Sequence, residues 1–193
     1  MKRVIAILFV LFAFTSCGVV KQIKQVTNMA SCDFKLINVE DVRVAGISLE
    51  NKKSIGDLSL TDATRLAQAA VANSFPLTFM LNVEAHNPND QIAGLNTLEW
   101  TLYIDDIEMV SGVNAVPISI PAKGTTVIPL AIDVELQKVL TGRSGQAIMN
   151  FGFNLAGENG VPTRIKLKAK PTILVGNFPI SYPGYITVTN VVK

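Results

Sequence analysis

The sequence is poor in the side chains on which most enzymes and metal sites depend. Its 193 residues include one histidine, His86, and two cysteines, Cys17 and Cys32. Any catalytic triad or histidine-rich metal site would therefore have to use His86. His86 ends an alternating segment on its polar side and precedes Asn87, so a solvent-facing residue at a strand end is the simpler interpretation. We therefore predict no catalytic residue, no cofactor and no metal site, and hence no enzyme.

One pair of adjacent carboxylates, Asp105 and Asp106, could suggest a cation site. A calcium-binding loop needs further oxygen ligands at regular spacing, and none follows this pair. The pair separates two alternating apolar segments, which favours a tight turn instead.

The chain also has no strong excess of charge of either sign. It contains 17 Lys and Arg against 15 Asp and Glu, and two of the basic residues, Lys2 and Arg3, lie at the extreme N-terminus. Without those two, the basic and acidic residues are equal in number. A near-neutral domain has no global attraction for nucleic acid, so we expect no nucleic-acid partner.

The first 17 residues have three parts: a basic start, an apolar run from Val4 to Phe14, and Thr15-Ser16-Cys17. Secretory signals have this build, and the run is too short to span a membrane as a helix. The junction resembles a lipobox, the site cut by lipoprotein signal peptidase. The resemblance implies that residues 1–16 are removed and that Cys17 carries diacylglycerol and an acylated amine, palmitate among its acyl chains. A signal anchor, or an ordinary secretory signal with a chance cysteine, is the alternative.

A lipidated Cys17 would make the membrane a partner of this chain. Two or three acyl chains, at about 0.8 kcal/mol per buried methylene, anchor a protein firmly. Gly18 follows the cysteine where Asp would favour the inner membrane, and no acidic run follows it. We therefore expect the periplasmic face of the outer membrane.

Lipidation would also leave Cys32 without a partner in its own chain, which excludes an intramolecular disulfide. Cys32 is then either a small buried apolar residue or the site of a disulfide between chains. We interpret residues 17–32 as a lipidated tether, flexible or weakly helical, and residues 33–193 as one domain, a length ample for a single core.

Alternating apolar and polar residues dominate this domain. The clearest run extends from Leu77 to Ala85, and a bulge is expected in the first strand near Asn38–Asp41. Pro129 donates no ladder hydrogen bond, so its strand should lie at an edge or carry a bulge. The predicted strand segments are 34–44, 77–85, 98–104, 107–110, 116–120, 128–136, 165–170, 173–175 and 185–192. This pattern predicts an all-β, mainly antiparallel sandwich of about seven strands.

One amphipathic helix is predicted within the sandwich, near 61–74. Its apolar residues recur at helical spacing, Ser59 or Thr61 can cap its start, and Pro76 excludes helix after it. We expect the apolar stripe to pack closely on a sheet. The stripe consists of Ala63, Leu66, Ala67, Ala70 and Val71. A short helical turn is expected at 136–140, whereas residues 144–156 fit helix or strand.

Two motifs in order lie between residues 79 and 135. Asn87-Pro88-Asn89 follows a strand, and Ile120-Pro121-Ala122-Lys123-Gly124 precedes another. This arrangement resembles the type 2 late embryogenesis abundant family, also called the WHy (water stress and hypersensitive response) domain. The resemblance implies a fibronectin type III-like, immunoglobulin-like β-sandwich, in which the helix near 61–74 is an insertion. Asn87, Pro88, Asn89, Pro121 and Gly124 are the motif residues, structural in the first place and candidates for binding in the second.

Two functions remain open at this point. The first is a membrane-anchored, non-enzymatic envelope module with a structural, stress-related or partner-binding role, the partner being an envelope protein or lipid. The alternative is a carrier of lipids or other hydrophobes that uses an apolar groove between the sheets, with the helix as its lid. Composition allows either function, because 49% of the residues are hydrophobic and only 17% are charged.

Overall fold

A computed structural model describes residues 24, 27–50, 52, 55–139, 147, 150–152, 162–175 and 177–192. The expected signal peptide, its junction with Cys17 and most of 144–156 lie outside these residues. Within them, a helical turn at 27–30 precedes the first strand. The elements are β1 (Asp33–Val44), β2 (Ile47–Ser48), η1 (Ile55–Asp57), α2 (Leu60–Ala72), β3 (Pro76–His86), β4 (Ala93–Leu95), β5 (Thr97–Ile104), β6 (Ile107–Asn114), β7 (Ile118–Ile120), β8 (Thr125–Glu135), α3 (Leu136–Val139), β9 (Thr163–Val175), β10 (Phe178–Ser181) and β11 (Ile186–Val192).

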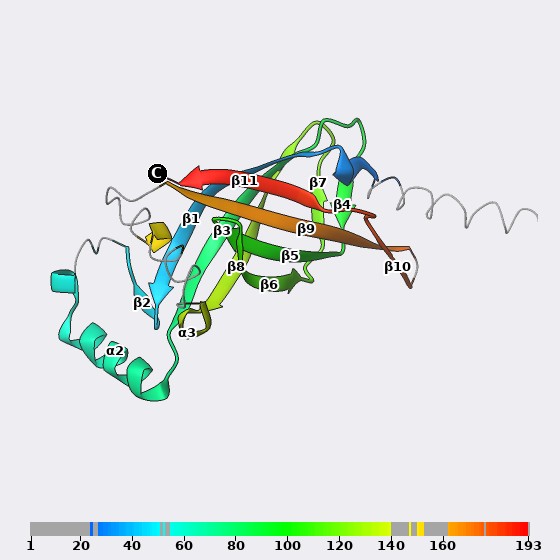
Figure 1. Ribbon diagram of the computed structural model, residues 1–193. Coiled ribbons are helices and arrows are strands. Elements are labelled where there is room, and N and C mark those ends of the chain that lie inside the picture. The colour runs from blue at the N-terminus through cyan, green and yellow to red at the C-terminus, as the bar shows by residue number, and fades with distance from the viewer. Residues whose placement is uncertain are drawn as a thin grey trace, which may run out of the picture.

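The strands form two main sheets whose directions cross (Figure 1). One sheet has the order β2-β1-β3-β8, and the other has the order β10-β9-β5-β6 with β11 also paired to β9. Strands β4 and β7 form a small third ladder. Every strand pair is antiparallel. The all-β sandwich is therefore confirmed, with seven strands of at least seven residues and four shorter ones in the described part of the chain.

The core follows the alternation read from the sequence. In β3, five alternate residues from Leu77 to Ala85 are buried, and in β5 the buried set includes Trp100. Side chains of this size each contribute about 1.5–3 kcal/mol when fully buried, so the two inner faces supply most of the driving force for folding. Strand β1 carries two register shifts, one on each side of the segment 38–40, as its broken alternation predicted. Strand β8, which contains Pro129, is a sheet edge, also as predicted.

Helix α2 begins and ends as its sequence predicts. Ser59 and Asp62 form a reciprocal capping box, and Asn73 closes the C-terminus in the left-handed conformation with φ 55°. The expected packing is wrong, however. Four of the five stripe residues are exposed, Val71 by 90%, and α2 projects away from the sandwich (Figure 1). The least exposed side chains of α2 are Asp62, Leu66 and Ala69, of which only Leu66 belongs to the stripe, so α2 does not serve as a lid.

One smaller expectation also differs from the structure. Strand β6 does not end near Gly112 but continues to Asn114, with Gly112 opposite Trp100. Strand β9 lies inside its sheet, because it pairs with β5 on one side and with β10 and β11 on the other. Its partly exposed lysines cover one face of that sheet.

Candidate functional site

The two sequence motifs meet at one end of the sandwich. Strands β3 and β8 pair along their whole length, and the last pair joins His86 to Thr125. The segment Asn87–Asn89 leaves β3 at the same point where Pro121–Gly124 enters β8. Residues more than thirty positions apart in sequence are thereby brought into contact.

Asn87 is the centre of this cluster and is completely buried. Its Nδ2 donates to the carbonyl oxygens of Gln91 at 2.9 Å, Ile120 at 3.1 Å and Pro121 at 3.0 Å. Its Oδ1 accepts from Asn89, from the backbone N–H at 3.0 Å and from Nδ2 at 2.8 Å. The whole hydrogen-bonding capacity of the amide is used inside the protein, so a ligand could bind Asn87 only by displacing these partners.

The loop before β8 contacts the segment Asn87–Asn89 through its backbone and through the Lys123 side chain. Lys123 has φ 54°, and its backbone N–H donates to Asn89 O at 3.0 Å while its Nζ reaches Pro88 O at 2.7 Å. Gly124 is held close, because a Cβ there would lie 3.0 Å from Cβ of Pro121. The five motif residues thus act together as a clamp between the β3 and β8 ends.

The clamp also holds the start of the domain. Asn89 Nδ2 donates to Asn28 O at 3.1 Å, and Asn28 Nδ2 donates to Ile92 O at 3.3 Å. Cys32 is buried beside them, with Sγ 3.4 Å from Asn28 O. Burial, with the nearby charge of Asp33, raises the pKa of the Cys32 thiol to about 11, which makes it a poor nucleophile. Of the two alternatives for Cys32, a small buried residue and the site of a disulfide between chains, the structure therefore supports the first.

The remaining candidates carry no catalytic arrangement. His86 is exposed, with Nδ1 3.2 Å from Thr125 Oγ1. Asp105 and Asp106 form the expected tight turn, with φ of 49° and 64°. Asp106 pairs with Lys166 and with Arg164, and the Lys166 hydrogen bond lowers the pKa of its carboxyl. Across the residues that the structure describes, no group of three or more His, Cys, Asp or Glu is placed to hold a metal ion.

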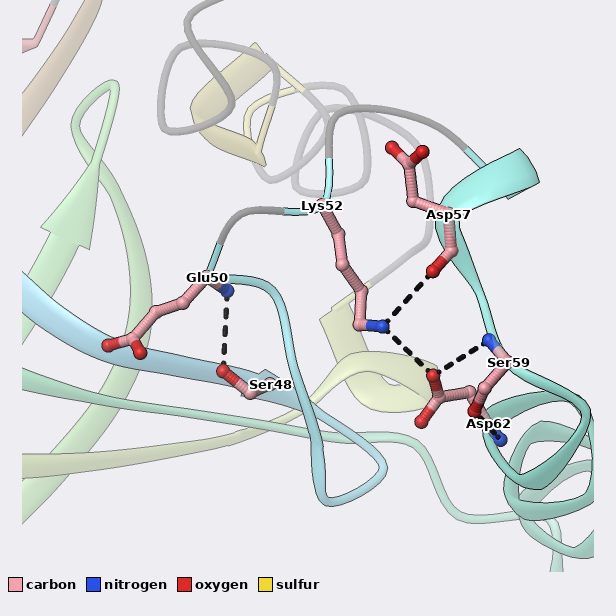
Figure 2. A network of polar contacts seen from close by, with 6 residues as sticks. All are labelled: Ser48, Glu50, Lys52, Asp57, Ser59 and Asp62. Carbon is pink, nitrogen blue, oxygen red and sulfur yellow. Dashed lines mark hydrogen bonds and ion pairs between the residues drawn. The ribbon is translucent and has the colours of Figure 1, made fainter.

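A second polar network fixes the start of α2 (Figure 2). Lys52 Nζ donates to Asp62 Oδ2 at 2.9 Å and to Asp57 O at 3.2 Å. Ser59 N also donates to Asp62 Oδ2, at 3.0 Å, and its hydroxyl accepts from Asp62 N. The Lys52 hydrogen bond, followed by those from Ser59, lowers the pKa of Asp62 to about 2. The network orients α2 but presents no unfilled site.

At least two hollows are lined by described residues. One of about 370 Å³ opens on the outer face of β5 and β6, beside Tyr185 and Lys168. The other, of about 250 Å³, lies at the seam between β1 and β11, where Asn190 Nδ2 donates to Leu36 O at 3.2 Å. Ligand pockets are typically 300–1,000 Å³, so the seam hollow is small for a carrier, and between the sheets the core side chains are packed.

The sequence missed two members of these networks. Asn28 lies in the expected tether, and no local pattern connects it to a loop 61 residues away. Lys52 lies in a stretch without periodicity, so its pairing with Asp62 had no signal either. No helix in the described part of the chain is long and apolar enough to cross a membrane.

Comparison with known proteins gives a family match and weak structural likenesses. The model of the family described as late embryogenesis abundant protein matches residues 82–183. A crystal structure of a protein from Archaeoglobus fulgidus is 12% identical, with TM-score 0.35 and coverage of 82% of this chain and 98% of that one. A solution structure from Arabidopsis thaliana is 16% identical, with TM-score 0.41 and coverage of 83% and 77%. A putative late embryogenesis abundant protein is also 16% identical, with TM-score 0.36 and coverage of 96% and 87%.

No curated protein matches the chain. The family match spans more than half of the 193 residues, from within β3 to just beyond β10, and it includes both halves of the clamp. On this match, the chain belongs to the late embryogenesis abundant protein family.

Proposed function

We propose that this protein is a lipid-anchored, non-enzymatic β-sandwich of the bacterial cell envelope, with a structural, stress-related or partner-binding role. Lipid on Cys17 holds it at the periplasmic face of the outer membrane. The basic start, apolar run and Ser16-Cys17 junction support the anchor, and family membership supports the non-enzymatic, stress-related role.

The observation that carries this proposal is the use of the family motif. The side-chain amide of Asn87 forms all of its hydrogen bonds within the protein. Asn89 connects the clamp by a hydrogen bond to Asn28, which lies only eleven positions after Cys17. The motif therefore fastens the domain to the segment that leads to the anchor. An asparagine whose amide is fully hydrogen-bonded within the protein is better suited to holding two segments together than to catalysis or ligand binding.

Metabolic labelling tests the anchor directly. Cells that express the full chain are fed an alkyne fatty acid, and the wild-type protein and Cys32→Ser should both become labelled. Cys17→Ser should lose the label and accumulate at precursor size, because its junction is no longer a lipidation substrate. Equal labelling of Cys17→Ser and wild type would contradict the proposal.

The carrier alternative depends on the hollow at the β1–β11 seam. Six apolar residues line it, among them Leu36 and Ile165, with Asn38 and Asn190 also in the lining. Its small volume favours the packed module over the carrier.

A further inference from the structure

The end of the β9–β10 hairpin is apolar on two faces and projects beyond the neighbouring strands (Figure 1). Leu174 is 44% exposed and pairs with Pro179 on one face, while Phe178, 78% exposed, and Ile180, 38% exposed, share the other face. We call Leu174, Phe178, Pro179 and Ile180 the tip surface. We propose that the tip surface enters the interface of the lipid bilayer that holds Cys17, an inference that rests on the proposed function.

The composition of the hairpin fits a lipid interface. The fifteen residues from Pro171 to Tyr185 contain no charged side chain, whereas Lys166, Lys168 and Lys170 precede them along β9. Apolar side chains on both faces suit an element that is surrounded, as a wedge in a bilayer is. Aromatic residues such as Phe178 and Tyr182 are favoured at this depth.

The hairpin lies at the end of the domain from which the anchor leaves. Asn28 Nδ2 donates to the carbonyl of Ile92 just before β4, and just after β4 Asn96 N donates to Thr172 O at 2.9 Å. Leu174 N donates to Asn96 Oδ1 at 2.8 Å. Four residues of extended chain, about 13 Å, separate the Asn28 contact from the hairpin contact. Figure 1 shows the segment near 27–32, β4 and β10 at one end of the molecule and α2 at the other.

The length of the tether keeps this end near the membrane. Eleven positions separate Cys17 from Asn28 and span at most about 40 Å when fully extended. A domain held so close meets the bilayer with the end that carries Asn28. The exposed apolar residues on that end, Ile92 at 44% among them, are therefore the ones that lipid covers.

A second copy of the chain fits the tip surface less well. Strand β10 is an edge, but it has four residues, and Pro179 removes a backbone donor from it. A stable interface uses about 20–30 residues a side, far more than this edge supplies. The unpaired edge also limits depth, since backbone groups without partners are not tolerated in the hydrocarbon core. The tip surface therefore reaches the headgroup and acyl boundary only.

The test uses the full chain, purified from the cells that process it, in vesicles of phosphatidylethanolamine and phosphatidylglycerol, with or without nitroxide-labelled acyl chains. In a Cys32→Ala background, Phe178→Cys carries an environment-sensitive fluorophore. Val71→Cys on α2, 90% exposed at the opposite end, is the matched control. We expect the label at 178 to shift to the blue and to be quenched by the nitroxide lipid, and the label at 71 to do neither. Leu174→Cys, on the other face of the hairpin, should behave like Phe178→Cys.

Flotation of the same vesicles separates the two proposals. A chain that floats while the labels at 178 and 71 are equally unquenched would overturn bilayer contact by the tip surface and leave the anchor standing. Equal quenching at both positions would also overturn it, because contact would not be specific to this end. A blue shift at 178 without lipid, with a dimer in size-exclusion chromatography, would assign the tip surface to a second copy. A chain that does not float would overturn the anchor and the tip contact together.

Discussion

The indole of Trp100 lies directly against the backbone of Gly112 on the neighbouring strand. A Cβ at Gly112 would lie 2.3 Å from Cζ2 of Trp100, a separation that no real contact allows. Trp100 is 7% exposed and points inward with its alternate neighbours in β5. The glycine therefore leaves the space that the largest side chain of the core occupies.

Gly112→Ala should destabilise the sandwich by about 1–3 kcal/mol, because the added methyl forces the indole and the strand to shift. Urea unfolding followed by fluorescence of Trp100, the single tryptophan, measures the effect. Gly152→Ala is the control, because no atom lies within 4 Å of its added Cβ. Equal midpoints for the two variants would mean that the indole does not lie where the structure places it.

Removing the amide of Asn87 should loosen the clamp. In Asn87→Ala the buried carbonyl of Ile120 and the partly buried carbonyl of Pro121 lose their donor, and the loss at a buried group costs about 1–3 kcal/mol. Asn87→Asp should cost more, because it buries a charge that can donate nothing to those carbonyls. His86→Ala removes an exposed neighbour and should change stability by less than about 0.5 kcal/mol. Chemical unfolding ranks the three variants, and a harmless Asn87→Ala would contradict the clamp.

The start of α2 should fray in acid. The folded-state pKa of Asp62 is about 2, below its usual value of 3.8, so the carboxylate stabilises the capped helix fully above about pH 4. That stabilisation is lost as the pH falls through about 2. Carbon-detected NMR of the Asp62 carboxyl, with the Ser59 amide shift as a reporter, follows the change. In Lys52→Met the pKa of Asp62 should rise, because the Lys52 hydrogen bond is the largest cause of the lowering. An unmoved titration in that variant would refute the assignment.

Bound lipid decides between the packed module and the carrier. We expect native mass spectrometry of the protein from membrane extract to show no lipid beyond the acyl chains on Cys17, because the seam hollow measures only about 250 Å³. Val191→Trp, which enlarges a half-exposed residue in the lining, is the matched variant. Stoichiometric phospholipid or fatty acid on the wild type, absent from Val191→Trp, would instead favour the carrier.

The strands were predictable because the alternation of residues in each strand reflects which of its faces is buried. In β3 the alternate residues from Leu77 to Ala85 face one core, so period two in the sequence becomes burial in the structure. The motif residues were predictable as a turn, but the full set of Asn87 side-chain hydrogen bonds was not, because two of the five reach Ile120 and Pro121, more than thirty positions away.

The predicted orientation of α2 was wrong for a similar reason. Its apolar stripe obeys helical periodicity, yet Lys52 and the capping box hold the Asp62 side of the helix toward the protein. A stripe with small side chains gains little from burial, so a single ion pair from a loop without periodicity can decide which face turns inward. Periodicity predicts where a helix lies in the sequence, whereas the contacts between the helix and neighbouring segments determine its orientation.

The path of the chain around α2 determines where this protein can tolerate inserted or exchanged sequence. Leu49 N donates to Val42 O beside β1, and Ser74 Oγ is held by Glu135 on the far side of β3. Strands β2 and β3 flank β1, about 10 Å apart, a gap that three or four residues could cross. The 24 residues from 50 to 73 occupy it instead. This connection is therefore a natural insertion point, where sequence can be exchanged, lengthened or replaced by a fused domain while the sandwich keeps its register.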